Sequence, residues 1–416
     1  MTGDGTSRCV RARRARRDDA VIALVLMTLA AGSFLFPPRA LREERFFCAR
    51  YVPVGAHAGI VVNCDSLVFM RLATAPGRLL EPGNRRQSRP LYVAAGAVIT
   101  RAFASWLPAA PVVTSPAFVA FVVVNAVVLG LAVFGFLRLL AGLTVPLVAV
   151  GCAALLVAND VVRLYFWTPH TQMFLVLVPV LCMLADRAVR VGSLPGRGHL
   201  LGLGLGSGAL VLAYGSGVLV AVSAAIGLVV HHRRVGTGLA SRRVAGDIAS
   251  LLGGLLVLPV GWFLVILATT GSFYSDEVGR FRQFVWLADA WSTGALGERV
   301  TVNLSRFASY VAETTWPAWA LLAAATALAA ASGVRPGNLG AVRGSLIGVA
   351  TTTLALTGTF FGLLGTYNWR LAWAVSPPLL ALAAVVLDAA VVSLGARGRP
   401  AASLLLGAAV LWSWLW

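Results

Sequence analysis

Residues 117–137 have the sequence AFVAFVVVNAVVLGLAVFGFL, which contains no charged side chain and a single amide, Asn125. A helix needs about 20 predominantly apolar residues to cross the hydrocarbon core of a bilayer. The stretch therefore predicts a membrane-spanning helix. Comparable apolar runs recur along the chain from residue 20 to residue 416.

The composition points to the same class of protein. Of the 416 residues, 58% are hydrophobic and 12% are charged, whereas soluble globular domains carry about 25% charged residues. These values exclude an ordinary soluble enzyme, a disordered chain and a small disulfide-rich secreted module. We predict an all-α integral membrane protein with many spans.

About eleven spans are predicted after a basic tail over residues 1–19, so that the polytopic domain covers 20–416. The run 200–230 is too long for one helix, and Gly215 and Gly217 indicate a break inside it. The predicted spans are 20–37, 117–137, 144–160, 170–186, 200–213, 215–230, 248–270, 316–333, 345–365, 372–395 and 401–416.

The distribution of arginine predicts the orientation. The formal net charge is +18, and every basic residue is Arg. Most of these residues lie between the spans, which favours contacts with membrane lipid over binding of nucleic acid. Placing the inter-span clusters in the cytoplasm predicts a cytoplasmic N-terminus and a multi-pass protein of the cell (cytoplasmic) membrane. Two large external loops result, over 38–116 and 271–315.

This topology requires that segment 90–107 does not cross the membrane. On a helix, Val98 and Trp106 share one face, while Thr100 and Arg101 share the other. A crossing helix would place Arg101 in hydrocarbon at a cost of about 2.5–3.5 kcal/mol. We therefore predict a helix that lies in the outer membrane interface.

The first external loop carries ten Arg residues, against the usual bias for positive charge in the cytoplasm. Arginine gives bidentate contacts to phosphate oxygens, so an anionic ligand such as a lipid phosphate is one explanation. A solvated loop that touches anionic headgroups is the other. The two explanations are evenly matched for Arg85, Arg86 and Arg89, which crowd beside the predicted interfacial helix.

Asp65 is the single acidic residue between Glu44 and Glu81. A carboxylate surrounded by Arg at a membrane surface stays ionised and can act as a general base on an acceptor hydroxyl or amine. A helix N-cap is the alternative, because the helix-like run 66–75 follows directly. On residue type alone the cap is favoured, and one role does not exclude the other.

Three motifs in this loop resemble the C-type (GT-C) glycosyltransferase superfamily. They are Asp65-Ser66-x-x-Phe69-x-x-Leu72-Ala73, Pro76-Gly77-Arg78-Leu79-Leu80 and Ser88-Arg89-Pro90-Leu91-Tyr92. The pattern is most similar to lipid A aminoarabinose transferases and protein O-mannosyltransferases. The resemblance implies a multi-spanning fold and a sugar donor linked to polyprenyl phosphate, used outside the membrane with inversion at the anomeric carbon.

The same resemblance implies roles for individual residues. Asp65 matches the catalytic base, and Arg89 approximates the basic residue before Pro-Leu. Two departures stand out, since Ser66 replaces a second acid and Pro90 stands alone where the family has a Pro pair. A lone carboxylate is a poor metal ligand set, so we predict no metal site, and the need for a divalent metal stays undetermined.

Two later regions add candidates. In the loop 159–170, the resemblance implies that Asp160 helps to build the site, with an ion pair to Arg163 as the alternative. For His170 we favour a capping role after Pro169. Near the C-terminal end, Arg370 is expected to bind the carrier phosphate, with an interfacial anchoring role as the alternative.

The predicted topology places Cys48 and Cys64 in one oxidising compartment, and we predict a disulfide between them. The leading function is glycosyl transfer from a polyprenyl-phosphate-linked sugar to a glycan, lipid or protein acceptor that the sequence does not identify. No cofactor is implied beyond this donor. The alternatives are a multi-pass lipid or solute transporter or flippase, and a non-catalytic assembly protein with the same fold.

Overall fold

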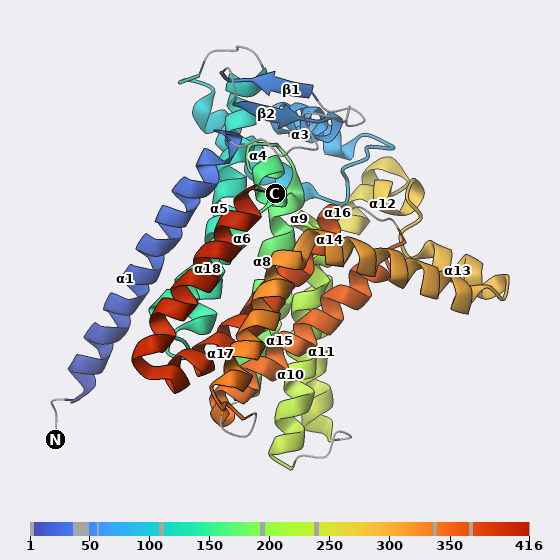
Figure 1. The fold of residues 1–416 in the computed structure, drawn as a ribbon. Helices are drawn as coiled ribbons and strands as arrows, with labels where there is room; N and C mark the ends of the chain where they lie inside the picture. Colours follow the sequence, from blue (N-terminus) through green and yellow to red (C-terminus); the bar gives the residue numbers. More distant parts are fainter. Residues whose placement is uncertain are drawn as a thin grey trace.

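The computed structural model describes residues 4–35, 50–55, 58–107, 112–191, 196–236, 241–335, 339–365 and 369–415. Within these residues the fold is α-helical, apart from one antiparallel hairpin of β1 (Arg50–Pro53) and β2 (Gly59–Val62), in which Tyr51 pairs with Val61. Long helices form a bundle, and the hairpin covers one end of it together with α3 (Cys64–Thr74) (Figure 1).

Seven segments of the described chain are helical, long and apolar enough to cross a membrane, as a multi-pass membrane protein requires. These segments are Arg17–Leu35, Pro116–Leu140, Gly215–Arg234, Arg242–Thr270, Leu296–Ala331, Gly340–Gly362 and Trp369–Trp414. The helices of the bundle are α1 (Asp4–Ala31), α5 (Pro116–Leu140), α6 (Pro146–Val157), α8 (Phe174–Val191), α9 (Arg197–Ala213), α10 (Val218–Arg234), α11 (Arg242–Thr270), α14 (Leu296–Ala331), α15 (Gly340–Gly362), α17 (Ser376–Leu394) and α18 (Gly398–Leu415).

Every predicted span overlaps one of these helices, but two boundaries differ from the prediction. Helix α6 has 12 residues, which corresponds to about 18 Å of helix and is short for a full crossing. Helix α14 begins at Leu296 and has 36 residues, so the second half of the predicted loop 271–315 is helical. Apolar residues spaced along 296–315 keep a helical period although the segment is too charged to look like a span.

Helix α4 (Pro90–Phe103) occupies the segment predicted to lie in the interface. Val98 and Trp106 point away from the protein, being 68% and 82% exposed. Thr100, expected on a solvent-facing side, is buried and donates a hydrogen bond to the carbonyl of Gly96 at 2.7 Å. The small residue Gly96 admits the ring of Phe121 from α5. The face of α4 that carries Gly96 and Thr100 is therefore the face that packs against α5.

Short elements complete the end that carries the hairpin. Helices α9 and α11 pack closely because Gly204 and Gly254 each leave room for the backbone of the opposite helix. This contact aligns α11 with the turn between α9 and α10. The short helices of the chain are α7 (Asp160–Tyr165), α12 (Asp276–Gly279), α13 (Val285–Ser292) and α16 (Trp369–Ala372).

Candidate functional site

A cavity of about 790 Å³ lies at the end of the bundle that carries α3, α12 and α16. Its walls come from segments that are far apart in the sequence: the first loop, the α9–α10 turn, α11, residues 273–284, and α15 to α16. The lining has two chemical characters. Its ionisable side chains include Asp65, Arg86, Arg89, His170, Glu277 and Arg370. Its aromatic side chains include Trp262, Phe263, Phe273, Phe284, Phe360 and Phe361.

Asp65 reaches the cavity from the first turn of α3. The N-cap of this helix is Asn63, whose side chain accepts a hydrogen bond from the backbone N–H of Ser66 at 2.8 Å. The hydroxyl of Ser66 accepts in turn from the backbone N–H of Asn63, which completes a capping box. The expectation that Asp65 caps the helix is therefore wrong. Asn63 satisfies the helix terminus and leaves the Asp65 carboxylate available for other partners.

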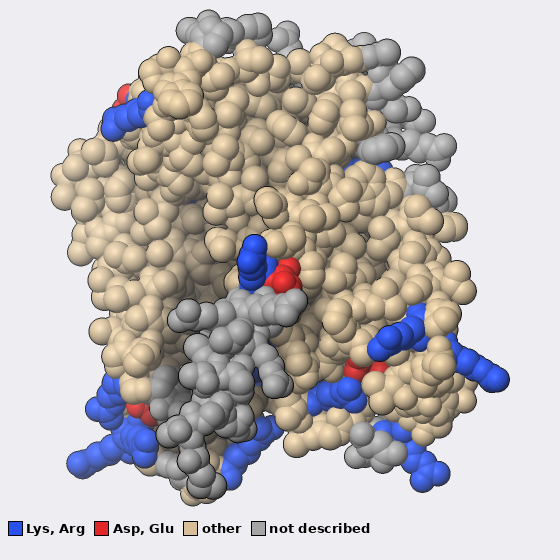
Figure 2. Space-filling model, turned by 90° about the vertical axis from the view of Figure 1, so that its left-hand side faces the viewer, with Lys and Arg blue, Asp and Glu red and all other residues tan. Residues whose placement is uncertain are grey.

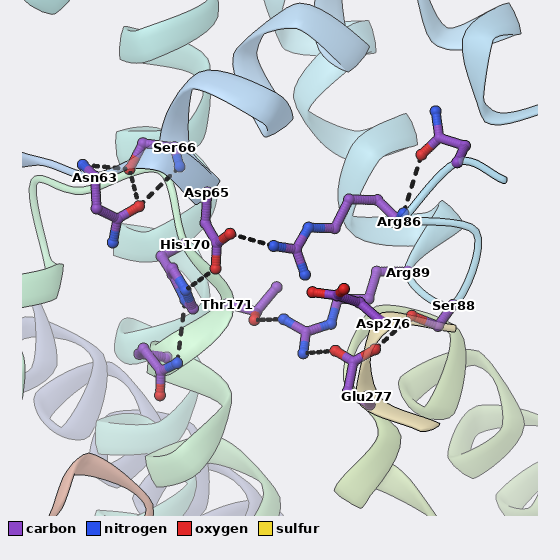
Figure 3. A network of polar contacts seen from close by, with 12 residues as sticks. Asn63, Asp65, Ser66, Arg86, Ser88, Arg89, His170, Thr171, Asp276 and Glu277 are labelled. Carbon is purple, nitrogen blue, oxygen red and sulfur yellow. Dashed lines mark hydrogen bonds and ion pairs between the residues drawn. The ribbon is translucent and has the colours of Figure 1, made fainter. Parts of the chain in front are cut away.

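The carboxylate of Asp65 lies between a cation and an imidazole (Figure 3). Arg86 donates to one carboxylate oxygen, and Nε2 of His170 lies 3.3 Å from the other. The guanidinium of Arg86 also stacks on the ring of Phe69, 5.1 Å from its centre. About 40% of the Asp65 side chain stays exposed, whereas the Arg86 and His170 side chains are buried. Asp65 therefore presents its open side to the cavity.

The hydrogen bonds around His170 define its tautomer. The amide nitrogen of Gln172 lies 3.1 Å from Nδ1 and can only donate, so Nδ1 accepts and Nε2 carries the proton toward Asp65. Burial lowers the pKa of His170 to about 4, against the opposing effect of the hydrogen bond to Asp65. His170 is therefore a neutral donor near pH 7. His170 does occupy the N-cap position of the 3-10 turn Thr171–Met173, as predicted, but its side chain makes no capping bond there.

The charge state of Asp65 follows from the same contacts. Burial by itself would raise the pKa of Asp65, but the hydrogen bond from His170 and the positive charges of Arg86 and Arg89 outweigh it. The pKa of Asp65 therefore lies well below its usual range, and the carboxylate is ionised at physiological pH.

Arg89 forms a second row of contacts beside Asp65 (Figure 3). Its guanidinium donates to the hydroxyl of Thr171 and to the carboxylate of Glu277, and it lies 5.3 Å from the centre of the Tyr214 ring. Burial by itself would raise the pKa of Glu277, but the positive charges of Arg89 and Arg86 and the hydrogen bonds to the carboxylate together outweigh burial and lower the pKa. Residues 89 and 277, 188 positions apart, thus form one largely buried ion pair.

The structure brings some predicted residues together and separates others. Arg370 lines the same cavity as Asp65 and donates to the hydroxyl of Tyr165 at 2.8 Å. Arg85 is exposed and does not line the cavity. Asp160 lines a different pocket of about 190 Å³ and pairs with Arg163, which was the alternative for this residue.

Sequence reasoning did not assign chemistry to Glu277, and no local signal identifies it. Its neighbours form a mixed-charge segment that is typical of an ordinary loop, and its role appears with the contact to Arg89. Cys64 is part of a disulfide, but Cys48 lies outside the described residues, so the predicted pairing stays a prediction. Within the described part of the chain, no group of three or more His, Cys, Asp or Glu side chains is arranged to hold a metal ion.

No protein-family model matches the chain, and no curated protein matches it. The geometry of the cavity therefore carries the functional argument.

Proposed function

We propose that the protein transfers a sugar from a polyprenyl-phosphate carrier to an acceptor at the extracytoplasmic face of the membrane, as a GT-C-like glycosyltransferase. The observation that carries the proposal is the mixed lining of the cavity. An amphiphile with an anionic head and an isoprenoid chain matches a lining that has four Arg side chains and eight aromatic rings.

The proposal includes the topology of about eleven spans with a cytoplasmic N-terminus. Figure 2 shows Lys and Arg side chains gathered in the lower part of the molecule, toward the end where the N-terminus and the α10–α11 turn lie in Figure 1. Arginine-rich ends face the cytoplasm in multi-pass proteins. The cavity, at the opposite end, would then face outward, and α4 would lie in the outer interface.

The proposed chemistry uses one base and two cations. Asp65 takes the proton from an acceptor hydroxyl or amine, and the acceptor atom attacks the anomeric carbon of the sugar. The bond from this carbon to the phosphate oxygen breaks, and its electron pair leaves with the polyprenyl phosphate. The phosphate thereby gains one negative charge, which Arg89 and Arg370 stabilise. Inversion at the anomeric carbon is what the GT-C resemblance implies.

Arg86 decides how basic Asp65 is during this step. A carboxylate held by a guanidinium has a low pKa and is a weak base. Arg86 and Arg89 lie on the same wall, so a phosphate that draws the Arg86 guanidinium toward itself would weaken the pair with Asp65. The carboxylate would then become more basic when the donor is in place. The hydrogen bond from His170 to the second carboxylate oxygen keeps Asp65 in its orientation.

The test uses the purified full-length protein in lipid nanodiscs with sugars linked to polyprenyl monophosphate or to polyprenyl diphosphate. We expect release of polyprenyl phosphate from monophosphate-linked donors when soluble acceptors are supplied. Turnover of diphosphate-linked donors alone would reject the carrier class. In proteoliposomes, movement of the lipid-linked sugar across the bilayer without sugar transfer would favour a flippase and reject the transferase.

A further inference from the structure

Residues 271–284 form a segment that covers one side of the cavity, between the end of α11 and the start of α13 (Figure 1). We call it the cover segment. It begins at Gly271, which ends α11 in the left-handed conformation with φ 74°. Phe273, Glu277 and Phe284 of this segment line the cavity. The segment therefore forms part of the cavity wall beside Arg89.

Apart from an exposed ion pair between Arg282 and Asp289 of α13, hydrogen bonds attach the cover segment to the rest of the protein at two places. At the first, Glu277 accepts from Arg89 and from the hydroxyl of Ser88 at 3.2 Å, and the backbone N–H of Tyr274 donates to Gln87 at 2.9 Å. All three partners of this attachment belong to the turn 87–89.

The second attachment lies at the other end of the cover segment. The backbone N–H of Phe284 donates to the carbonyl of Leu364 at 3.4 Å, and the indole of Trp286 donates to the carbonyl of Leu363 at 3.1 Å. This attachment uses uncharged groups, so an anion does not compete for it.

Backbone strain concentrates where the cover segment ends. Arg282 and Phe284 have φ of 50° and 60°, and among the described residues they are the non-glycine positions with positive φ. A bulky residue such as Phe rarely adopts this conformation, which costs about 1–3 kcal/mol and persists only when surrounding contacts enforce it. Loss of the Glu277 attachment would therefore favour relaxation of the segment.

We propose that Glu277 is a latch that competes with the phosphate of the ligand for Arg89, so that a phosphate monoester bound there releases the cover segment. The inference rests on the proposed function, because it assigns the polyprenyl phosphate as the competing anion. A carboxylate brings one negative charge, whereas a phosphate monoester brings nearly two and accepts bidentate bonds from a guanidinium.

The donor and the product differ in the charge of their phosphate, so the cover segment is released at one stage of the reaction and not at the other. The donor is a phosphodiester with one negative charge, which competes weakly with Glu277. The leaving polyprenyl phosphate is a monoester with a second charge and competes strongly. Release of the cover segment therefore follows bond cleavage, and it opens the cavity when the spent carrier has to leave.

The experiment measures amide hydrogen exchange of the cover segment in nanodiscs, with polyprenyl monophosphate as the probe and the free polyprenol as the uncharged control. We expect the monophosphate, and not the polyprenol, to increase exchange in residues 271–284 of the wild-type protein. In Glu277→Gln, exchange of this segment is already high without a probe, and the Kd for polyprenyl monophosphate falls about tenfold.

Asp289→Asn is the matched control, because it removes a carboxylate that pairs with Arg282 at the exposed end of the segment, at 2.6 Å, and does not touch Arg89. It should match the wild-type protein in affinity and in the response to the probe. Unchanged exchange elsewhere in the Glu277→Gln protein shows that the variant is folded.

Three results would overturn the inference in distinguishable ways. One such result is that the monophosphate binds the wild-type protein without raising exchange of residues 271–284, and that Glu277→Gln has the wild-type exchange and Kd. Glu277 is then not a latch, and polyprenyl monophosphate remains the proposed carrier. If neither protein binds the monophosphate, the donor class and the latch are both wrong. Weaker binding by Glu277→Gln would mean that Glu277 helps to hold the ligand, which also contradicts competition.

Discussion

Asp65 and Asp388 are both carboxylates paired with Arg in the same helical bundle, but their surroundings differ. Asp388 lies on α17, is 1% exposed, and accepts from Arg343 and from the backbone N–H of Val145, each at 2.6 Å. Asp65 is paired with Arg86 and His170, keeps about 40% of its side chain exposed and opens onto the large cavity. One carboxylate is enclosed by its partners, and the other retains an open side.

The difference separates an ion pair that joins helices from one that remains accessible from a cavity. Asp388 connects α17 to α15 through Arg343 and to the start of α6 through Val145, and it does not line the cavity. The pair at Asp65 leaves access for a third partner. A short distance between opposite charges does not distinguish these roles, whereas solvent access and neighbouring cations do.

The largest expected effect is on catalysis at the ion pair of Asp65 and Arg86, which we call the open pair because Asp65 keeps an exposed side. Asp65→Asn keeps the shape of the side chain but removes the base, so we expect sugar transfer to fall by about 10²–10⁴. Arg86 is buried and loses its charged partner, but the amide oxygen of the variant can still accept its hydrogen bond, so we expect the free energy of unfolding to fall by about 1–3 kcal/mol. Turnover assays and denaturation of the same preparation measure both quantities. Undiminished transfer would remove Asp65 from the mechanism.

The same substitution at the ion pair of Asp388 and Arg343, which we call the closed pair, should act on stability. Asp388→Asn removes the charge of a carboxylate that is 1% exposed and leaves Arg343, which is 28% exposed, without a charged partner, so we expect a loss of about 1–3 kcal/mol. The residual transfer rate per folded molecule should equal that of the wild-type protein. An equal loss of transfer per folded molecule in Asp65→Asn and Asp388→Asn would break the distinction between the two pairs.

The imidazole at the open pair predicts a dependence of stability on pH. Because burial lowers the pKa of His170 to about 4, the unfolded chain takes up a proton below about pH 6.5 and the folded protein does not. Stability is therefore complete above pH 6.5 and falls between pH 6.5 and pH 4, by at most about 3 kcal/mol.

His170→Gln tests the origin of this dependence, since its amide can still donate to Asp65 but does not titrate. We expect the loss of melting temperature between pH 6.5 and pH 4 to be smaller in the variant. Asp65 contributes at lower pH, because its lowered pKa gives stability that is present above about pH 4 and is lost below. If His170→Gln loses as much melting temperature between pH 6.5 and pH 4 as the wild-type protein, other titratable groups cause the pH dependence.

Much of the fold follows from the sequence because long apolar runs have few alternatives to a helix in a membrane. The candidate site was predictable in part. Asp65, Arg86, Arg89 and Arg370 carry charge in segments placed outside the membrane, and the structure brings all four to one cavity. They meet because the segments that carry them lie at the same end of the bundle.

The remaining features depend on contacts that local sequence does not specify. Asn63 and Asp65 are both good N-cap residues two positions apart, and the capping box with Ser66 decides between them. Glu277 becomes significant only when the fold places it on Arg89. Asp160 has a suitable type and position in the chain, but its pair with Arg163 holds it in another pocket.

The smallest expected effect concerns the cations of the open region. Arg370 lines the cavity and is anchored by the hydroxyl of Tyr165, so Arg370→Gln should weaken binding of polyprenyl monophosphate about 10- to 100-fold while leaving the melting temperature nearly unchanged. Arg85→Gln removes the same charge from an exposed position outside the cavity and serves as the control. Because the net charge of the two variants is equal, a difference in Kd isolates the location of the charge. Equal losses in both variants would indicate attraction by the general positive field of the loop, and the cavity would then have no specific phosphate contact at Arg370.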